Sequence, residues 1–300
     1  SNLLLERVDR AVAAWITIVL GVARAAHAQE ATTDPVAVSP LRWQEDWPRF
    51  RASEYALTGS LYLGALLSWK LLDDPTDGWV NNLVVDEAVR DALKLGPDGR
   101  RAARTTSDVV VAVAVAAPFV LDDALLALGV HRNTDVTLQL LLMDAQSVGL
   151  TMFLTTLTEK TVGRARPFVP DCAINPNSDP ECQNSDRFRS FLSGHSSFSF
   201  TGAGLICAHH EFLPLFSNRA AGRATCYTAL TVATTAGVLR IMGNMHHATD
   251  VLAGASVGIV SGYLLPRWLH FRPRNKSRTT SVLIPYATPT TTGVAYSSTF

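Results

Sequence analysis

The sequence predicts an all-α fold, a six-helix bundle followed by a small C-terminal β-hairpin. Two observations lead to this prediction. Apolar stretches of helix length recur along the chain between short polar breaks, and 47% of the 300 residues are hydrophobic, which is enough for a sizeable core. Helices of similar length with short connections pack as bundles. The predicted helices cover residues 55–72, 107–130, 136–157, 196–213, 224–242 and 248–265.

The first residues are expected to be a targeting segment. Residues 1–28 resemble a signal peptide, because two arginines precede an apolar run and a small-x-small pattern ends at Ala28. Cleavage there would start the mature chain near Gln29. The alternative is a first membrane anchor, and either one predicts export from the cytoplasm.

The remaining segments are assigned in order. Residues 29–54 form an ordered lead-in rich in aromatic and charged side chains, and residues 55–270 form the helical domain. A short helix is expected near residues 86–95, and the loop at residues 164–191 is long enough to be functional. Residues 271–300 are predicted to form a basic exit and the β-hairpin, to which no chemistry is assigned.

The charge balance of the chain limits its binding partners, and its cysteines bear on the redox state of its compartment. The chain has 26 basic and 26 acidic residues, so no overall field favours nucleic acid, and anion binding must be local. Cys172 and Cys182 flank a polar loop, where an oxidising compartment would allow a disulfide and a reducing one would leave two thiols. Cys207 and Cys226 lie in apolar stretches and are expected to be small core residues.

Three short blocks carry the residues suited to chemistry. They are Gly163-Arg164-Ala165-Arg166-Pro167, Leu192-Ser193-Gly194-His195, and Arg240, His246 and Asp250 in the spacing R-x5-H-x3-D. Histidines, arginines and one carboxylate are the groups that a phosphoryl-transfer site without a metal requires. The sequence therefore predicts such a site, with no cofactor and no metal.

Each block supplies a different part of this chemistry. Ser193 and Gly194 begin a predicted helix, whose free N–H groups form a phosphate-sized anion site. His195 then lies beside the anion and can protonate a leaving oxygen. His246 can attack phosphorus if its other ring nitrogen donates to Asp250, four residues later on the same helix face. Arginine side chains would bind the phosphoryl oxygens.

With these residues the chain resembles the type 2 phosphatidic acid phosphatase (PAP2) superfamily, whose motifs are K-x6-R-P, P-S-G-H and S-R-x5-H-x3-D. The matching residues occur in the same order in this chain. The resemblance implies a PAP2-type bundle in which His246 forms a phosphohistidine, His195 is the general acid and Asp250 orients the nucleophile. It further implies that phosphate is bound by Arg166, Ser193, Gly194 and Arg240.

Three positions depart from the family motifs. Leu192 replaces the motif proline and Leu239 replaces the motif serine. The most serious departure is Glu159, which takes the place of the motif lysine, because a carboxylate there would repel phosphate. We expect Lys160, one residue later, to turn in and bind phosphate; the alternative is that Arg164 supplies the missing cation.

Other polar groups inside the predicted helices are interpreted as structural. His209, His210 and Glu211 are adjacent, and neighbouring histidines diverge on a helix without completing a ligand set. Asp122 and Asp123 are expected to cap or interrupt a helix rather than to act in catalysis.

The relation of the bundle to a membrane stays open. The predicted helices carry charges that interrupt their apolar runs, so a membrane-associated protein and a soluble periplasmic one are both retained. If the leader is cleaved and all six helices span, the site faces the cytoplasm. If residues 55–72 do not span, the site faces outward and the basic segment at residues 267–278 lies inside.

The leading hypothesis is a metal-independent phosphatase of the cell envelope that hydrolyses a lipid phosphate or a small phosphomonoester through a phosphohistidine. Two alternatives are a vanadate-dependent haloperoxidase-like enzyme and a catalytically impaired phosphate-binding protein, the latter motivated by Glu159, Leu192 and Leu239. The sequence does not identify the substrate or the oligomeric state.

Overall fold

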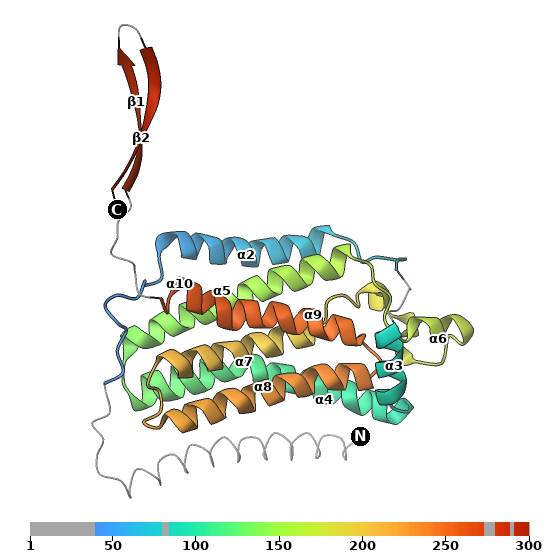
Figure 1. Ribbon diagram of the computed structural model, residues 1–300. Coiled ribbons are helices and arrows are strands. Elements are labelled where there is room, and N and C mark those ends of the chain that lie inside the picture. The colour runs from blue at the N-terminus through green and yellow to red at the C-terminus, as the bar shows by residue number, and fades with distance from the viewer. Residues whose placement is uncertain (1–39, 80–83, 273–279, 289–290, 300) are drawn as a thin grey trace, which may run out of the picture.

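The computed structural model describes residues 40–79, 84–272, 280–288 and 291–299, and it confirms the all-α class of the domain (Figure 1). The expected signal peptide at residues 1–28 lies outside these residues. Long helices lie side by side in the bundle. They are α2 (Ala52–Leu71), α4 (Pro97–Ala117) with its π-helical continuation η1 (Pro118–Val130), α5 (Thr134–Thr161), α7 (Gly194–Phe212), α8 (Arg219–Met242), and α9 (Ala248–Ile259) continued by η4 (Val260–Leu264) and α10 (Leu265–Leu269).

Shorter elements lie at one end of the bundle, so the predicted count of six helices is not confirmed. Helices α3 (Val84–Leu93) and α6 (Val169–Ile174) lie there, across the ends of the long helices (Figure 1). The 3-10 turns η2 (Pro180–Gln183) and η3 (Ser185–Phe188) follow α6 in the chain. At the C-terminus, β1 (Thr280–Thr288) pairs antiparallel with β2 (Thr291–Thr299).

The path of the chain gives the bundle two different ends. Helices α2, α5 and α8 run toward the end that carries α3 and α6, and α4, α7 and α9 start from it (Figure 1). We call this end, with residues 162–193 and 243–247, the loop end. The segments just before α2 and just after α10 both lie at the opposite end, where Leu41 and Phe271 share one buried cluster.

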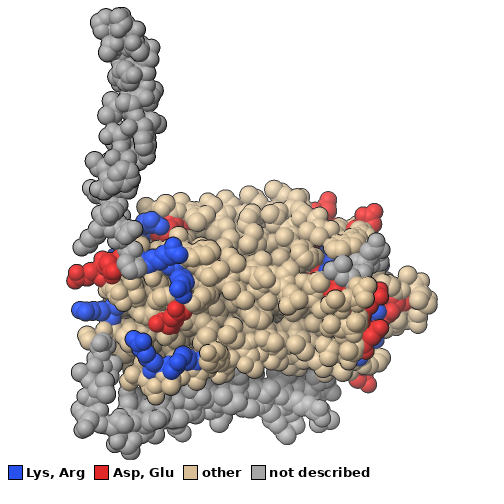
Figure 2. Space-filling model, viewed as in Figure 1, with Lys and Arg blue, Asp and Glu red and all other residues tan. Residues whose placement is uncertain are grey.

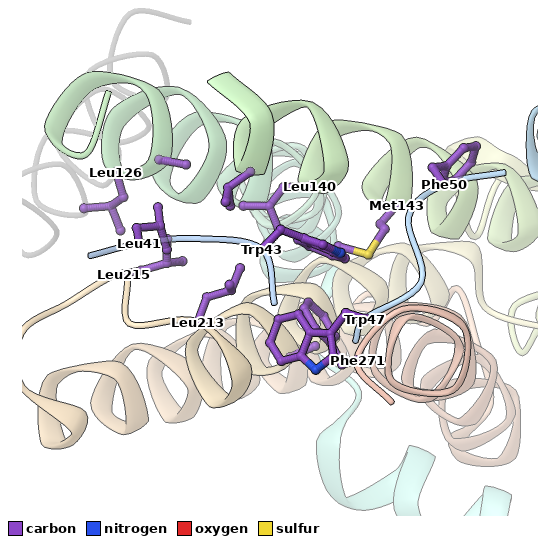
Figure 3. Close-up of a cluster of buried hydrophobic side chains, with 13 residues drawn as sticks. Leu41, Trp43, Trp47, Phe50, Leu126, Leu140, Met143, Leu213, Leu215 and Phe271 are labelled. Atoms are coloured by element: carbon purple, nitrogen blue, oxygen red, sulfur yellow. The ribbon is translucent and has the colours of Figure 1, made fainter. Parts of the chain in front are cut away.

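Aromatic packing anchors residues 40–51 to the opposite end. The rings of Trp43 and Trp47 meet edge to face with centroids 5.4 Å apart, and Trp47 lies 5.1 Å from Phe271. These rings pack against Leu140 and Met143 of α5 in the main buried cluster (Figure 3). Large aromatic side chains contribute strongly to such a core.

Glycines let α9 approach α7 closely. A Cβ atom on Gly258 would lie 2.5 Å from the carbonyl oxygen of Ser197, and one on Gly262 would lie 2.1 Å from that of Thr201. Small residues spaced four apart allow two helix backbones to touch. This contact matters for function because α7 begins next to His195 and α9 begins next to His246.

Replacing Gly258 with leucine is therefore expected to separate α9 from α7 and to lower both stability and turnover. The added side chain meets backbone atoms that cannot move aside, and overpacking of this kind costs about 1–3 kcal/mol or more. The Tm of thermal unfolding and the turnover rate should both fall for this variant. Gly59→Leu is the matched control, since a Cβ on Gly59 meets nothing within 4 Å; equal behaviour of the two variants would contradict the prediction.

Many large apolar side chains are exposed on the bundle. Figure 2 shows that Lys, Arg, Asp and Glu gather at the two ends, with an uncharged band between them. Three helical stretches, at residues 97–130, 134–161 and 248–269, are long and apolar enough to cross a membrane. The exposed large apolar side chains include Leu63, Leu66, Leu67, Trp69, Leu125, Leu128, Leu138, Leu141, Tyr227, Leu252 and Ile259.

Three carboxylates within the predicted helices do not interrupt this surface. Asp122, Asp123 and Asp144 are almost completely buried, so they face the interior of the bundle. Hydropathy along the chain could not separate an inward carboxylate from an outward one, which is why the sequence left the membrane question open.

Both cysteine pairs are disulfides. Cys172 and Cys182 are joined across the loop end, with Cα atoms 5.6 Å apart. Cys207 of α7 and Cys226 of α8 are also joined, which corrects the expectation that they are unpaired core residues. Apolar flanking sequence indicated burial, but only the packing of α7 against α8 brings these two residues together.

Candidate active site

His246 lies in the tight connection between α8 and α9, at the loop end of the bundle. Its ring is buried, and Nδ1 lies 2.8 Å from the carbonyl oxygen of Ser190. A carbonyl oxygen only accepts, so Nδ1 carries the proton and Nε2 keeps its lone pair. Burial, and then the positive charges of Arg166 and Arg240, lower the pKa of His246 well below its ordinary value. The neutral imidazole that a nucleophile requires is therefore favoured.

The hydrogen bond expected between His246 and Asp250 is not formed. Their closest atoms, Nδ1 and Oδ2, are 4.0 Å apart. Asp250 instead accepts hydrogen bonds from the hydroxyl of Ser190 at 2.6 Å and from the backbone N–H of His247 at 3.0 Å. Ser190 thus stands between the two residues, bonding His246 with its carbonyl and Asp250 with its hydroxyl. Sequence reasoning missed Ser190 because a loop serine has no distinguishing pattern.

Arg164 holds the carboxylate of Asp250 from the other side. One of its terminal nitrogens pairs with Asp250, and the other pairs with Asp86 of α3 at 2.7 Å. The guanidinium also covers the ring of Trp79, with 4.7 Å between its carbon and the ring centroid. Asp86 in turn accepts from the backbone N–H of Thr249 at 2.9 Å. Because both of its terminal nitrogens are committed to these buried partners, Arg164 does not replace the motif lysine.

The first turn of α7 contributes backbone N–H groups to the site. Ser193 is the N-cap, and its hydroxyl accepts from the N–H of Ser196. The N–H groups of Gly194 and His195 have no partner within the helix, so they and the positive helix end face the loop end. A Cβ on Gly194 would lie 3.2 Å from Thr155 and 3.3 Å from Glu159. Glycine therefore lets α7 begin close to α5.

Asp108 of α4 connects two of the predicted site residues. Its Oδ1 lies 2.7 Å from Nε2 of His195 and 3.3 Å from Nη1 of Arg240. Arg240 also donates to the hydroxyl of Ser107 at 3.2 Å. The sequence offered no signal for Asp108, because it lies outside all three motif blocks. Burial lowers the pKa of His195 below its ordinary value, and the carboxylate of Asp108 opposes this effect by favouring the protonated imidazole that a general acid needs.

Arg166 completes a positive cluster beside His246. Its Nη2 pairs with Asp186 at 2.9 Å, and its Nη1 points to the carbonyl oxygen of Met245, the residue before His246. Burial is the main influence on Arg166 and lowers its pKa. The positive charges of Arg166 and Arg240 both act on the imidazole of His246 and lower its pKa.

The ion pairs formed by Glu159 and Lys160 differ from the expectation that Lys160 binds phosphate. Lys160 does not turn toward the site, since its Nζ lies 2.8 Å from Asp74. Glu159 does approach the start of α7, but Nη2 of Arg189 holds it at 2.6 Å. Arg189 also reaches Asp74 at 3.4 Å. The cation beside the motif-lysine position is therefore Arg189. A sequence comparison at that position could not find it, because Arg189 is thirty residues away from Glu159 along the chain.

The other two departures are structurally mild. Leu192 is buried next to the N-cap of α7. Leu239 lines an apolar surface groove on α8, together with Tyr227 and Met242.

The structure gathers the three motif blocks at one end of a helical bundle, the arrangement that the sequence resemblance implies. Residues 140–274 match the model of the PAP2 superfamily. The part of the chain that carries the site is therefore similar to proteins of the PAP2 superfamily. It includes the whole of α7, α8 and α9 and most of α5.

Two curated proteins illustrate the similarity. The chain is 35% identical over 104 residues to "Probable diacylglycerol pyrophosphate phosphatase 1" of Schizosaccharomyces pombe, covering 34% of this chain and 36% of that protein. It is 28% identical over 146 residues to "Probable lipid phosphate phosphatase 4" of Arabidopsis thaliana, covering 42% and 47%. The matches thus span about a third to a half of these relatives. No solved structure matches the chain.

Proposed function

We propose that this protein is a membrane-embedded phosphatase that hydrolyses lipid phosphates through a phosphohistidine intermediate on His246. The observation that carries the proposal is the state of His246. Its Nδ1 proton is donated to the carbonyl of Ser190 at 2.8 Å, its Nε2 has no hydrogen-bond partner among the described residues, and the positive charges of Arg166 and Arg240 act on the ring. A neutral nucleophile facing cations is suited to attack on an anionic phosphoryl group.

The first half of the reaction transfers the phosphoryl group to the enzyme. Nε2 of His246 attacks phosphorus, the N–P bond forms, and the bond from phosphorus to the substrate oxygen breaks. His195, held by Asp108 at 2.7 Å, donates its proton to that leaving oxygen. The ring of His246 becomes positive in this step, and the carbonyl of Ser190 and the nearby carboxylate of Asp250 stabilise it.

The second half releases phosphate and restores the site. His195, now neutral, takes a proton from a water molecule as the water oxygen attacks phosphorus. The N–P bond breaks, and its electron pair returns to Nε2 of His246. Arg166, Arg240 and the first turn of α7 bind the phosphoryl oxygens throughout. These groups supply the positive charge, so the proposal requires no metal at this site.

A lipid substrate is supported by the position of the site. It lies at the end of a bundle whose outer surface carries an uncharged band (Figure 2), so a headgroup at the membrane surface could reach His246 while its chains stay in the bilayer. The names of the two relatives also indicate phosphorylated lipids. We further propose that the site faces the periplasm, an oxidising compartment in which the Cys172–Cys182 disulfide of the loop end would persist.

A substrate panel tests the proposal. Purified protein in detergent micelles is given phosphatidate, diacylglycerol pyrophosphate, a polyprenyl pyrophosphate and soluble phosphomonoesters, with and without a chelator added at the start of the assay. We expect phosphate release to be fastest from a lipid and unchanged by the chelator. Faster release from soluble esters would refute the lipid class, and prompt loss with the chelator would refute the metal-independent mechanism.

A further inference from the structure

A second buried cluster lies inside the bundle, separate from the candidate active site. It consists of Asp122 and Asp123 of η1, Asp144 of α5 and His209 with His210 of α7. All five side chains are almost completely buried. His209 is fourteen residues after His195 on α7, about 21 Å along the helix axis at 1.5 Å per residue. The cluster therefore takes no part in the chemistry at His246.

Part of this cluster is fully paired. Nδ1 of His209 lies 2.9 Å from one oxygen of Asp122, and Nε2 of His210 lies 3.1 Å from the other. A carboxylate accepts hydrogen bonds, so both histidines present N–H groups to Asp122. With its proton on Nδ1, His209 directs the lone pair of Nε2 toward Asp123 and Asp144.

The other part of the cluster has no hydrogen-bond partner in the described chain. Both oxygens of Asp123, both oxygens of Asp144 and Nε2 of His209 are buried and unsatisfied. Nε2 and Oδ1 of Asp144 are only 3.1 Å apart, and one ligand atom from each of the three residues lies within 4.8 Å of the others. Unpaired carboxylates in such an interior are costly, and a cation between them would offset this cost.

We infer that Asp123, Asp144 and His209 bind one divalent transition-metal ion of the zinc or manganese type. Imidazole together with carboxylate oxygens is a ligand set that suits such ions. Asp122 takes the role of the carboxylate that fixes the ring and tautomer of a metal-binding histidine. Sequence reasoning assigned these residues structural roles because they are distant along the chain, and only the packing of η1, α5 and α7 makes them converge.

The π-helical form of η1 is a second sign of a specialised site. In an α-helix, consecutive side chains point about 100° apart, yet Asp122 and Asp123 are both turned into the interior. The wider π turn brings these neighbours toward the same region, and π segments occur frequently at functional sites. The bound ion would join three helices of the bundle, so its expected effect is on stability.

The test measures metal binding by the full-length protein, purified in detergent with a tag that contains no histidine. The protein is stripped by long dialysis against a chelator, reloaded with Zn²⁺, Mn²⁺ or Mg²⁺ alone, and analysed for bound metal and thermal unfolding. We expect about one Zn²⁺ or Mn²⁺ per chain, no retention of Mg²⁺, and a higher Tm in the loaded protein. No retained ion and an unchanged Tm in the wild-type protein would overturn the inference.

Isosteric variants locate the ion. Asp123→Asn and Asp144→Asn keep the side-chain shape and remove a ligand charge, so each should weaken binding at least about ten-fold. Glu211→Gln is the control, since Glu211 lies on the same helix but is exposed and bonds Tyr263 and Arg267. Equal metal binding by all three variants would show that the ion lies elsewhere. Metal content and Tm are independent of phosphatase turnover, so failure here leaves the proposed function standing.

Discussion

Replacing His246 with alanine is expected to abolish phosphate release, lowering kcat by at least about a thousand-fold. The variant loses the only atom that the proposal allows to form a bond with phosphorus, while the arginines and the α7 terminus remain to bind substrate. Substrate affinity should therefore change much less than turnover. Labelled substrate followed by an alkaline quench should give a phosphorylated protein in the wild type and none in the variant.

Two further variants make this result interpretable. His246→Asn keeps a polar group in the buried space and should be equally inactive, which separates loss of the nucleophile from loss of packing. His131→Ala removes a histidine at the opposite end of the bundle, where its Nε2 contacts the carbonyl of Leu215, and should keep near-normal turnover. Undiminished phosphate release by His246→Asn would exclude the phosphohistidine mechanism.

The second large effect is expected for Arg164→Met. This change leaves the carboxylates of Asp86 and Asp250 buried without their cation, and breaking a buried pair in this way costs about 3–5 kcal/mol of the free energy of unfolding. Burial alone would raise the pKa of Asp86, but hydrogen bonds from Thr249 and Arg164 outweigh it and lower the pKa. Asp86 is therefore charged in the folded protein and depends on Arg164. Turnover should fall as well, because Asp250 is linked through Ser190 to His246.

Denaturant unfolding and turnover are measured together for this variant. Arg187→Met is the control, because Arg187 is exposed and lies in the same loop. The double change Arg164→Met with Asp86→Asn should recover part of the lost stability, since it removes one of the two stranded charges. A free energy of unfolding for Arg164→Met equal to that of Arg187→Met would contradict a structural role for the buried pair.

Local pattern was sufficient to predict the long helices and the three motif blocks. Helix-length apolar runs give the all-α class because their spacing is a property of neighbouring residues. The same holds for the N-cap at Ser193 and for the spacing of Arg240, His246 and Asp250. The shorter helix α6 was missed because its six residues are too few to show a period.

Pairings between distant residues were beyond such local patterns. Lys160 was the expected replacement for the motif lysine because it is adjacent to Glu159, yet the cation that binds Glu159 is Arg189. Asp250 was expected to bond His246 directly, but the loop inserts Ser190 between them. In both cases the partner comes from the loop that folds over the helix ends. The position of this loop depends on contacts across the whole domain.

The sequence alone established the helical class, the PAP2 resemblance and the histidines, because these depend on residue type and spacing along one segment. The direction of each buried charge was determined only by the packing of the helices. Asp122, Asp123 and Asp144 looked like interruptions of apolar helices until η1, α5 and α7 placed them together inside the bundle. The physical reason is that a carboxylate in a helix can face lipid, water or a partner, and its neighbours in space decide among these at a cost of several kcal/mol.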